Sequence, residues 1–353
     1  MKKILLVVDC FNGGAGNMAQ ILFVNFSAKY DVDLLIMDHR NSKPKYSIPE
    51  DKIIYFNSEK AKAFKYIWKS TRFIKKLIKE KKYNTVISFL DNINTVVAFA
   101  LFWNKKINLI VSERSNPLVI PPSNKLWSIL RKIAYKRANY VSIQFDEFKH
   151  FENSKFIDKC VETPNLILPS PSKRIVREDN IVKFISCARF AKIKRFDLLI
   201  NLFSSIHNHC PNTKLTICGD GPEKEKIEKL IDELNLSDSV ELVGNVKNTY
   251  DYLKNSDIYL MTSLQEGFPN ALSEGLATGL PAVVFKCHDG IKKLVIDNYN
   301  GYCIDEGDIK EYINKCVYLA NNKNINNEFG NNSIEVANKY SPDKVLSIWE
   351  KLL

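Results

Sequence analysis

Short apolar runs alternate with longer amphipathic stretches along the whole chain of 353 residues. The runs are rich in Val, Ile and Leu and are bounded by turn residues, which is typical of buried strands. They predict strands at residues 4–8, 32–37, 85–89, 109–112 and 140–143, and again at 181–186, 214–218, 240–243, 258–261 and 281–285. Strands that alternate with helical segments in this way indicate an α/β protein with parallel sheets.

A segment rich in Pro and Ser separates the two series of strands. Thr163-Pro164-Asn165 is followed by Pro169-Ser170-Pro171-Ser172, a composition that favours a linker between domains. We therefore expect one domain at residues 1–168, a second at 169–340, and a final helical segment at 341–353.

The stretch after the strand at 258–261 carries the clearest chemistry. It passes through Glu266-Gly267-Phe268-Pro269 to Asn270, a candidate N-cap for a helix expected at 271–278, and Gly279 ends that helix. A Gly-containing loop that leads into a helix N-terminus points backbone N–H groups at an anion such as a diphosphate.

Two carboxylates, Glu266 and Glu274, frame this predicted anion site. Beside a phosphate they are well placed to accept hydrogen bonds from sugar hydroxyls, which points to a nucleotide sugar. The alternative is that both are ordinary acids near a helix N-terminus, where they complement the helix dipole.

The first turn of the second domain is basic. Arg189 at the end of the strand and Lys194 before the next helix place two cations at the same sheet edge as Glu266. Fixed cations can stabilise a departing diphosphate without a metal. A basic turn taken alone can equally be solvated surface.

Two loops of the first domain also follow predicted strands. The turn from Phe11 to Asn17 contains Gly14, Ala15 and Gly16 before a helix expected at 18–29, although a plain turn would look the same. The second loop, after the strand at 109–112, contains Arg114 and Asn116. Its alternative interpretation is a capped loop with an internal ion pair between Glu113 and Arg114.

These motifs resemble the retaining glycosyltransferases of family 4, which have the GT-B fold of two Rossmann-like doubly wound domains facing each other across a cleft. Glu266 and Glu274, with seven residues between them that include Gly-Phe-Pro-Asn, match the family signature. The turn with Arg189 and Lys194 resembles its Gly-Arg-Leu, spacer, Lys-Gly pattern, with Ala188 and Arg195 replacing the two glycines. The loop of Arg114 resembles a Ser-Glu-Arg-Asn-Asp-Pro segment of bacterial members that build capsule, exopolysaccharide or O-antigen chains.

The resemblance implies a metal-independent hexosyltransferase without a cofactor that moves a hexose or N-acetylhexosamine from a UDP-sugar to a growing, lipid-linked surface saccharide with α linkage. Glu266 would hold sugar hydroxyls, Glu274 the ribose, and Arg189 and Lys194 the diphosphate, while Arg114 and Asn116 would contact the acceptor. The final helix would cross back to the first, acceptor-binding domain. The implied donor-binding residues are Gly14, Ala15, Gly16, Val243, Asn245, Gly267, Phe268, Pro269, Asn270, Ala271 and Glu274.

The net charge of +11 is concentrated in residues 1–168, where 28 Lys and Arg face 15 Asp and Glu. The segment from Lys60 to Lys82 holds ten basic residues and one acid with apolar residues at helical spacing, and the segment from Lys125 to Arg137 is similar. Both could simply pack on a sheet with solvated lysines, or bind nucleic acid. We expect them instead to bind the anionic inner face of the plasma membrane, which makes the protein cytoplasmic and peripheral.

Several other classes are disfavoured. No apolar run approaches 18 residues, and Asp9 interrupts the first apolar run too early for a signal peptide. The eight cysteines are widely spaced, which favours reduced thiols over disulfides or a zinc site. Asp31-Val32-Asp33 matches the metal-binding motif of another glycosyltransferase fold, but it begins a strand, so we expect no metal site there.

Two rival functions remain open. A glycan phosphorylase shares the GT-B layout but needs a lysine placed for pyridoxal phosphate. A non-enzymatic, basic membrane-binding or nucleic-acid-binding protein would explain the basic segments but not Glu266, Glu274, Arg189 and Lys194.

Overall fold

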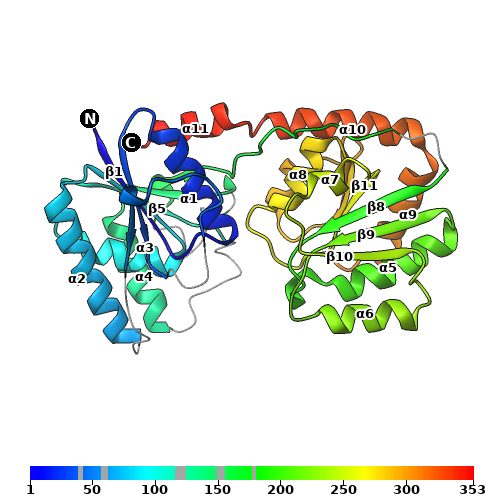
Figure 1. The fold of residues 1–353 in the computed structure, drawn as a ribbon, viewed down its shortest axis with the longest axis horizontal. Coiled ribbons are helices and arrows are strands. Elements are labelled where there is room, and N and C mark those ends of the chain that lie inside the picture. Colours follow the sequence, from blue (N-terminus) through cyan, green and yellow to red (C-terminus); the bar gives the residue numbers. More distant parts are fainter. Residues whose placement is uncertain (39–42, 57–62, 116–124, 147, 149–155, 177–179) are drawn as a thin grey trace. The chain divides into compact units, whose positions relative to one another are not determined.

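The structure, a computed structural model, describes residues 1–38, 43–56, 63–115, 125–146, 148, 156–176 and 180–353. The chain divides into two compact units (Figure 1). Unit 1 holds Met1–Asn165 and Val345–Leu353, and unit 2 holds Leu166–Lys344. Among the described residues we find no helix with both the length and the apolar character that spanning a bilayer requires.

Unit 1 is built on a parallel sheet of seven strands in the order β3-β2-β1-β4-β5-β6-β7. Its central strands are buried almost completely and consist mostly of Val, Ile, Leu and Phe, as expected for a sheet covered on both faces. The strands are β1 (Lys3–Val8), β2 (Asp31–Ile36), β3 (Ile53–Tyr55), β4 (Thr85–Phe89), β5 (Asn108–Ser112), β6 (Tyr140–Ile143) and β7 (Cys160–Glu162).

The helices of unit 1 follow the strands in sequence. Helix α3 contacts both α2 and α4, and these three lie side by side against the sheet (Figure 1). Trp349 near the C-terminus is fully buried and packs against Phe89 of β4, so the end of the chain belongs to the core of unit 1. The helices are α1 (Gly13–Phe26), α2 (Ala63–Lys81), α3 (Asp91–Ala100) and α4 (Lys125–Arg137), together with the part of α11 (Pro342–Glu350) from Val345 on, and 3-10 turns lie at Glu50–Lys52 and Ile157–Lys159.

Unit 2 is built on a parallel sheet of six strands in the order β10-β9-β8-β11-β12-β13. A single apolar core joins this sheet to α5, α6, α9 and α10. The strands are β8 (Val182–Cys187), β9 (Thr213–Cys218), β10 (Val240–Gly244), β11 (Ile258–Met261), β12 (Ala282–Phe285) and β13 (Gly301–Ile304). The helices are α5 (Phe196–His209), α6 (Lys224–Glu233), α7 (Tyr250–Leu253), α8 (Asn270–Thr278), α9 (Ile309–Asn321) and α10 (Lys323–Asn338), with 3-10 turns at Lys192–Lys194 and Asp289–Lys293.

Both sheets have the doubly wound order, in which the chain reverses its direction of winding once. The reversal lies between β1 and β4 in unit 1 and between β8 and β11 in unit 2. Loops at the carboxyl ends of the two central strands diverge there, which makes this the usual ligand position of such sheets. The sequence-based prediction of two parallel α/β sheets is confirmed.

Some predicted elements differ from the structure. The first helix begins at Gly13 and not at residue 18, so the predicted glycine loop is largely the first turn of α1. It ends at Phe26 instead of residue 29. Three strands, β3, β7 and β13, were not predicted because they are only three or four residues long and lie toward the edges of the sheets.

Candidate functional site

The two central loops of unit 2 are joined to each other at the winding reversal. Strands β8 and β11 pair directly, so the loop that follows β8 lies beside the loop that follows β11. The Oγ1 of Thr262 donates to the carbonyl oxygen of Lys194 at 3.0 Å, and Arg195 Nε donates to the carbonyl oxygen of Thr262 at 2.9 Å. The backbone N–H of Leu264 adds a bond to the carbonyl oxygen of Ile193 at 2.8 Å.

These contacts bring Lys194 onto Glu266. Lys194 Nζ lies 2.5 Å from Glu266 Oε1, and the two side chains are only 19% and 13% exposed. The sequence predicted both residues as site members but assigned them to different parts of a ligand. The structure adds that they form one ion pair, which fixes the carboxylate and the ammonium before any ligand binds.

Arg195 departs from the sequence pattern of the resembling family, and the structure shows how this residue is accommodated. Its backbone is left-handed, with φ of 53°, a conformation that glycine adopts most easily. This is the position at which the resembling family has glycine. Arg195 keeps the conformation because its side chain is held by Thr262 and by an ion pair with Glu306.

Arg189 lies on the same loop, and its side chain is exposed. Among the described residues, no hydrogen-bond or ion-pair partner of its guanidinium is found. The turn of Gly219 and Gly221 supports its backbone, because a Cβ at either glycine would overlap with Ala188 or Phe190. Arg189 is therefore a cation available to a ligand, on a backbone that is held in place.

Helix α8 begins at the end of the loop that carries Glu266. It starts at Asn270 with Pro269 as the N-cap, one residue earlier than predicted, because the carbonyl oxygen of Pro269 already accepts the N–H of Ser273 at 3.0 Å. Gly279 ends the helix in the predicted left-handed conformation, with φ of 94°. Backbone N–H groups in the first turn of any α-helix lack intrahelical acceptors and can bind an anion.

Glu274 is directed toward the loop after β10. Its Oε2 accepts from Thr249 Oγ1 at 2.7 Å, and Thr249 follows the turn of Val243, Gly244 and Asn245. Gly244 is left-handed with φ of 71°, and its carbonyl oxygen accepts the N–H of Gly219. Gly244 thus ties the turn that contains Val243 and Asn245 to the loop of Gly219, and Thr249 holds Glu274. That Val243, Asn245 and Glu274 bind the donor stays a prediction.

Tyr259 lies beneath both carboxylates. Burial raises the pKa of Tyr259 well above its usual range, with further contributions from Cys187 and from the negative charges of Glu274 and Glu266. Its hydroxyl donates to the carbonyl oxygen of Cys187 at 3.2 Å, which ties β11 to the loop of Arg189. The closeness of helix α8 requires Gly275, where a Cβ would lie 2.8 Å from the Tyr259 ring.

Sequence reasoning missed Tyr259, Thr249 and His288 as parts of this site. His288 Nε2 lies 3.1 Å from the carbonyl oxygen of Gly267 and so contacts the loop of Glu266. No local motif marks these residues, since each reaches the site only through the folding of distant strands.

Gly14, Ala15 and Gly16 lie at the winding reversal of unit 1. Gly13 is left-handed with φ of 77°, and Gly16 packs so closely that a Cβ would overlap with the carbonyl oxygen of Cys10. The glycines therefore let α1 start directly behind β1. That they face a donor stays a prediction.

Arg114 differs from the expected acceptor-facing cation, because it is 8% exposed and holds unit 1 together from within. Its guanidinium donates to Ser112 Oγ at 2.7 Å, Thr163 O at 2.9 Å, Asn165 Oδ1 at 3.0 Å and Ser142 Oγ at 3.0 Å. Burial lowers the pKa of Arg114 to about 9. Its hydrogen bonds fasten the ends of β5 and β6 to the segment that leaves unit 1.

The alternative interpretation of this loop, an internal ion pair of Glu113 and Arg114, is not what the structure shows. Glu113 instead pairs with Arg131 at 3.3 Å and accepts the hydroxyl of Tyr135, both from α4. Arg114 stacks on the ring of Trp349 at 5.2 Å. Asn116, the other predicted acceptor residue, lies outside the described residues.

Asp31 and Asp33 are engaged by side chains that belong to the fold. Asp31 lies 2.7 Å from Lys52 and 3.1 Å from Lys3, and Asp33 accepts the hydroxyl of Tyr83 at 2.5 Å. In the part of the chain that the structure describes, we find no cluster of His, Cys, Asp or Glu that could hold a metal ion.

The family model described as "Glycosyl transferases group 1" matches residues 171–336, which is most of unit 2. An uncharacterized glycosyltransferase of Methanocaldococcus jannaschii is 32% identical over 285 residues, 72% of this chain and 69% of the relative.

A second relative has a more specific name. It is the N-acetylgalactosamine-N,N'-diacetylbacillosaminyl-diphospho-undecaprenol 4-alpha-N-acetylgalactosaminyltransferase of Campylobacter jejuni, which is 27% identical, with 86% of each chain covered. Among solved structures, Anabaena HepE in complex with UDP superposes with a TM-score of 0.79 at 15% identity, covering 100% of this chain and 98% of that one. The GT-B fold class predicted from the sequence is confirmed.

Proposed function

The chain belongs to the glycosyl transferases of group 1, and on that premise we propose that it is a retaining enzyme that forms an α linkage. The donor in this proposal is a UDP-linked hexose or N-acetylhexosamine. The acceptor is a growing, lipid-linked saccharide of the bacterial surface. The printed name of the Campylobacter jejuni relative, with its alpha linkage and diphospho-undecaprenol acceptor, and the UDP bound by HepE support the proposal.

One observation carries the proposal: the preformed pair of Lys194 and Glu266 at the winding reversal of unit 2, with Arg189 exposed beside it. A carboxylate held by a lysine keeps its second oxygen available for sugar hydroxyls. Lys194 and Arg189 then supply positive charge where the leaving diphosphate becomes more negative. The backbone N–H groups at the start of α8 add to the same anion site.

Retention in this proposal proceeds by attack from the face that the diphosphate leaves. The bond from the sugar to the diphosphate oxygen breaks, the acceptor hydroxyl forms the new bond, and the departing oxygen takes the acceptor proton. Arg189 and Lys194 stabilise that oxygen while its charge develops. Glu274, oriented by Thr249, is assigned to the ribose.

Side-chain cations take the place of a metal ion in this scheme, and no resident cofactor is needed. The matching test is transfer activity in excess EDTA. We expect the rate to stay within twofold of the untreated enzyme, whereas a loss restored by Mg²⁺ or Mn²⁺ would show that a metal carries part of the charge.

Donor binding is tested by thermal shift with UDP, GDP, ADP and their common sugars. A ligand present at 100 times its Kd stabilises the folded state by about 2.7 kcal/mol, which is several degrees in Tm. We expect UDP or a UDP-sugar to raise Tm in the wild type and not in Arg189→Ala. Lys192→Ala, a variant of an exposed lysine on the same loop, is the matched control and should keep the shift.

The same assay separates the rival functions. A Tm increase with inorganic phosphate and a glycan, together with phosphate-dependent cleavage, would favour a phosphorylase. No shift with any nucleotide would contradict the transferase proposal.

A further inference from the structure

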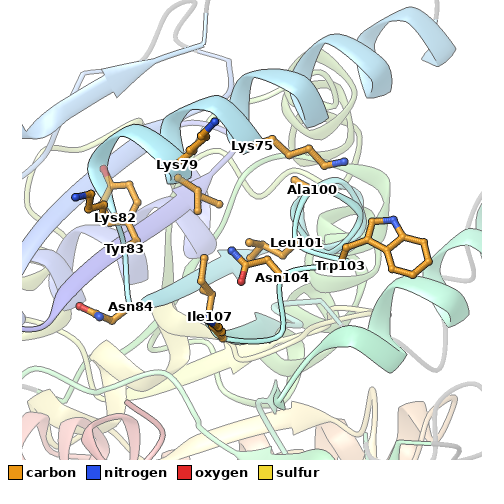
Figure 2. A pocket seen from close by; sticks show the side chains of 12 residues that line it. Lys75, Lys79, Lys82, Tyr83, Asn84, Ala100, Leu101, Trp103, Asn104 and Ile107 are labelled. Carbon is orange, nitrogen blue, oxygen red and sulfur yellow. The ribbon is translucent and has the colours of Figure 1, made fainter.

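Unit 1 also has a candidate binding site on its surface, which lies away from the sheet edge at which its strands end. It is a pocket of about 590 Å³ between the end of α2, the end of α3 and the segment that leads into β5 (Figure 2). Asn84 and Ile107, both in its lining, directly precede β4 and β5. The pocket therefore lies at the amino-terminal edge of the sheet, opposite the edge that carries ligands in doubly wound folds.

Four lysines line this pocket, which we call the lysine pocket. Lys75, Lys79 and Lys82 come from α2 and the residue after it, and Lys106 comes from the segment before β5. All four are exposed, and none has an ion-pair partner among the described residues. The one acid of this helix, Glu80, pairs instead with Lys76, which does not line the pocket.

The helix ends in the pocket do not account for this charge. Lysines in the last turn of α2 complement its C-terminus, but Lys106 belongs to another segment. The carbonyl groups around the end of α3 are already bonded, because Arg137 donates to Leu101 O at 2.8 Å and to Ile107 O at 2.7 Å. The positive charge of the lysine pocket is therefore available to a ligand.

The pocket also has an apolar part. Ile78, Leu101 and Ile107 form a buried apolar lining, and Trp103 stands at the rim with 86% of its surface exposed (Figure 2). An exposed Trp beside lysines is typical of the boundary between lipid head groups and acyl chains.

We propose that the lysine pocket binds the phosphate of an anionic membrane phospholipid while Trp103 inserts at the membrane interface. The phosphate is drawn by four uncompensated ammonium groups, and lysines near an anionic leaflet each strengthen binding. The sequence predicted membrane contact along the whole segment from Lys60 to Lys82 and along a second one from Lys125 to Arg137. The structure narrows the site to the end of α2 and adds Lys106 and Trp103, which lie outside both segments.

This inference goes beyond the proposed reaction and does not depend on it. The lysine pocket lies within unit 1, whereas the donor-site residues Arg189, Lys194 and Glu266 lie in unit 2. Failure of lipid binding would leave the Tm shift with UDP intact, and failure of UDP binding would leave lipid binding intact.

The test is co-sedimentation of the full chain with vesicles of phosphatidylcholine alone or with phosphatidylglycerol added. We expect binding only to the anionic vesicles. The variant Lys75→Gln/Lys79→Gln/Lys106→Gln should lower the partition coefficient by about two orders of magnitude at low salt. Trp103→Ala should lower it further in the same vesicles, because the interfacial anchor is lost.

The matched control removes the same charge from exposed lysines of unit 2. Lys214→Gln/Lys310→Gln/Lys339→Gln should bind anionic vesicles like the wild type. An unchanged Tm and UDP shift in both triple variants would show that they are folded.

Three results would overturn the proposal. One is wild-type protein that binds no vesicle, and another is a lysine-pocket variant that binds as well as its control. The third is millimolar inorganic phosphate that raises Tm through the same lysines and abolishes vesicle binding, which would make the pocket a site for a soluble phosphate.

Discussion

The two units have the same doubly wound order of central strands but use the carboxyl edge of the sheet differently. In unit 2 the loops after β8 and β11 are joined by Thr262, and they present the pair of Lys194 and Glu266. In unit 1 a tight glycine turn follows β1, and the buried Arg114 follows β5, the strand next to β4. The same scaffold thus carries charged chemistry at its edge in one unit and structural cross-links in the other.

The two units also differ in where their charged side chains lie. Four lysines of unit 1 that have no acidic partner among the described residues line a pocket at the opposite edge of its sheet. Two sheets with the same strand order can therefore have different functions. The function of each sheet edge has to be inferred from the side chains that lie there.

The largest loss of activity is expected from a change at Glu266, which belongs to the charged edge of unit 2. Glu266→Gln keeps the shape of the side chain but removes the charge that orients Lys194 and accepts sugar hydroxyls. We expect kcat to fall by about 10²–10³ while the protein stays folded, measured as sugar transfer from the donor that the thermal-shift panel identifies. Glu306→Gln, which removes the other ion pair of this loop, is the control and should lose less than tenfold.

In unit 1 the buried cation should matter for stability. Arg114→Ala leaves several buried acceptors without a donor and removes the contact with Trp349, so we expect a loss of about 3 kcal/mol in the free energy of unfolding. The measurement is urea unfolding followed by Trp fluorescence, which reports on unit 1 because all four Trp residues lie there. Arg72→Ala, an exposed arginine of the same unit, should change stability by no more than about 0.5 kcal/mol. Equal losses in both variants would contradict the role of Arg114.

The turn after β1 contains two glycines, Gly13 and Gly16, whose replacement by alanine should destabilise unit 1 to different extents. At Gly16 a Cβ would overlap with backbone atoms of Cys10 and Phe11, whereas at Gly13 it would meet open space and only the left-handed φ opposes it. Gly16→Ala should therefore cost about 3 kcal/mol and Gly13→Ala about 1 kcal/mol of unfolding free energy. The same fluorescence assay measures both, and a reversed order would show that the turn is not closely packed.

The smallest effect concerns pH. The hydrogen bond from Lys52, with Lys3 nearby, lowers the pKa of Asp31. A carboxylate with a lowered pKa stabilises the fold above its usual pKa of about 3.9, and this contribution is lost as the pH falls through the lowered value. Asp31→Asn should therefore flatten the decline of the unit 1 unfolding midpoint below about pH 4, whereas Asp51→Asn should not. Identical slopes for the two variants would contradict this assignment.

Much of the fold could be predicted from the sequence because buried parallel strands are short, continuous apolar runs. The strands at residues 85–89, 140–143 and 258–261 match β4, β6 and β11 at both ends. β3 and β13 could not be predicted in the same way, since an edge strand of three or four residues carries too little apolar pattern.

The site was predictable only in part. Arg189, Lys194, Glu266 and Glu274 follow predicted strands or start a predicted helix, so the topology alone places them at one edge. The pairing of Lys194 with Glu266 and the role of Tyr259 depend on how two loops pack, which no local pattern encodes. Arg114 shows the reverse case, because a motif that resembles a binding loop holds a buried structural residue.

The central claim is tested most directly by the product itself. Purified enzyme would be incubated with UDP-sugars and a diphospho-undecaprenol-linked saccharide, and the new linkage would be assigned by NMR. We predict a single added sugar with the α anomeric configuration of the donor, formed by the wild type and not by Glu266→Gln. A β-linked product, or equal transfer by both proteins, would contradict a retaining reaction at the site of Lys194 and Glu266.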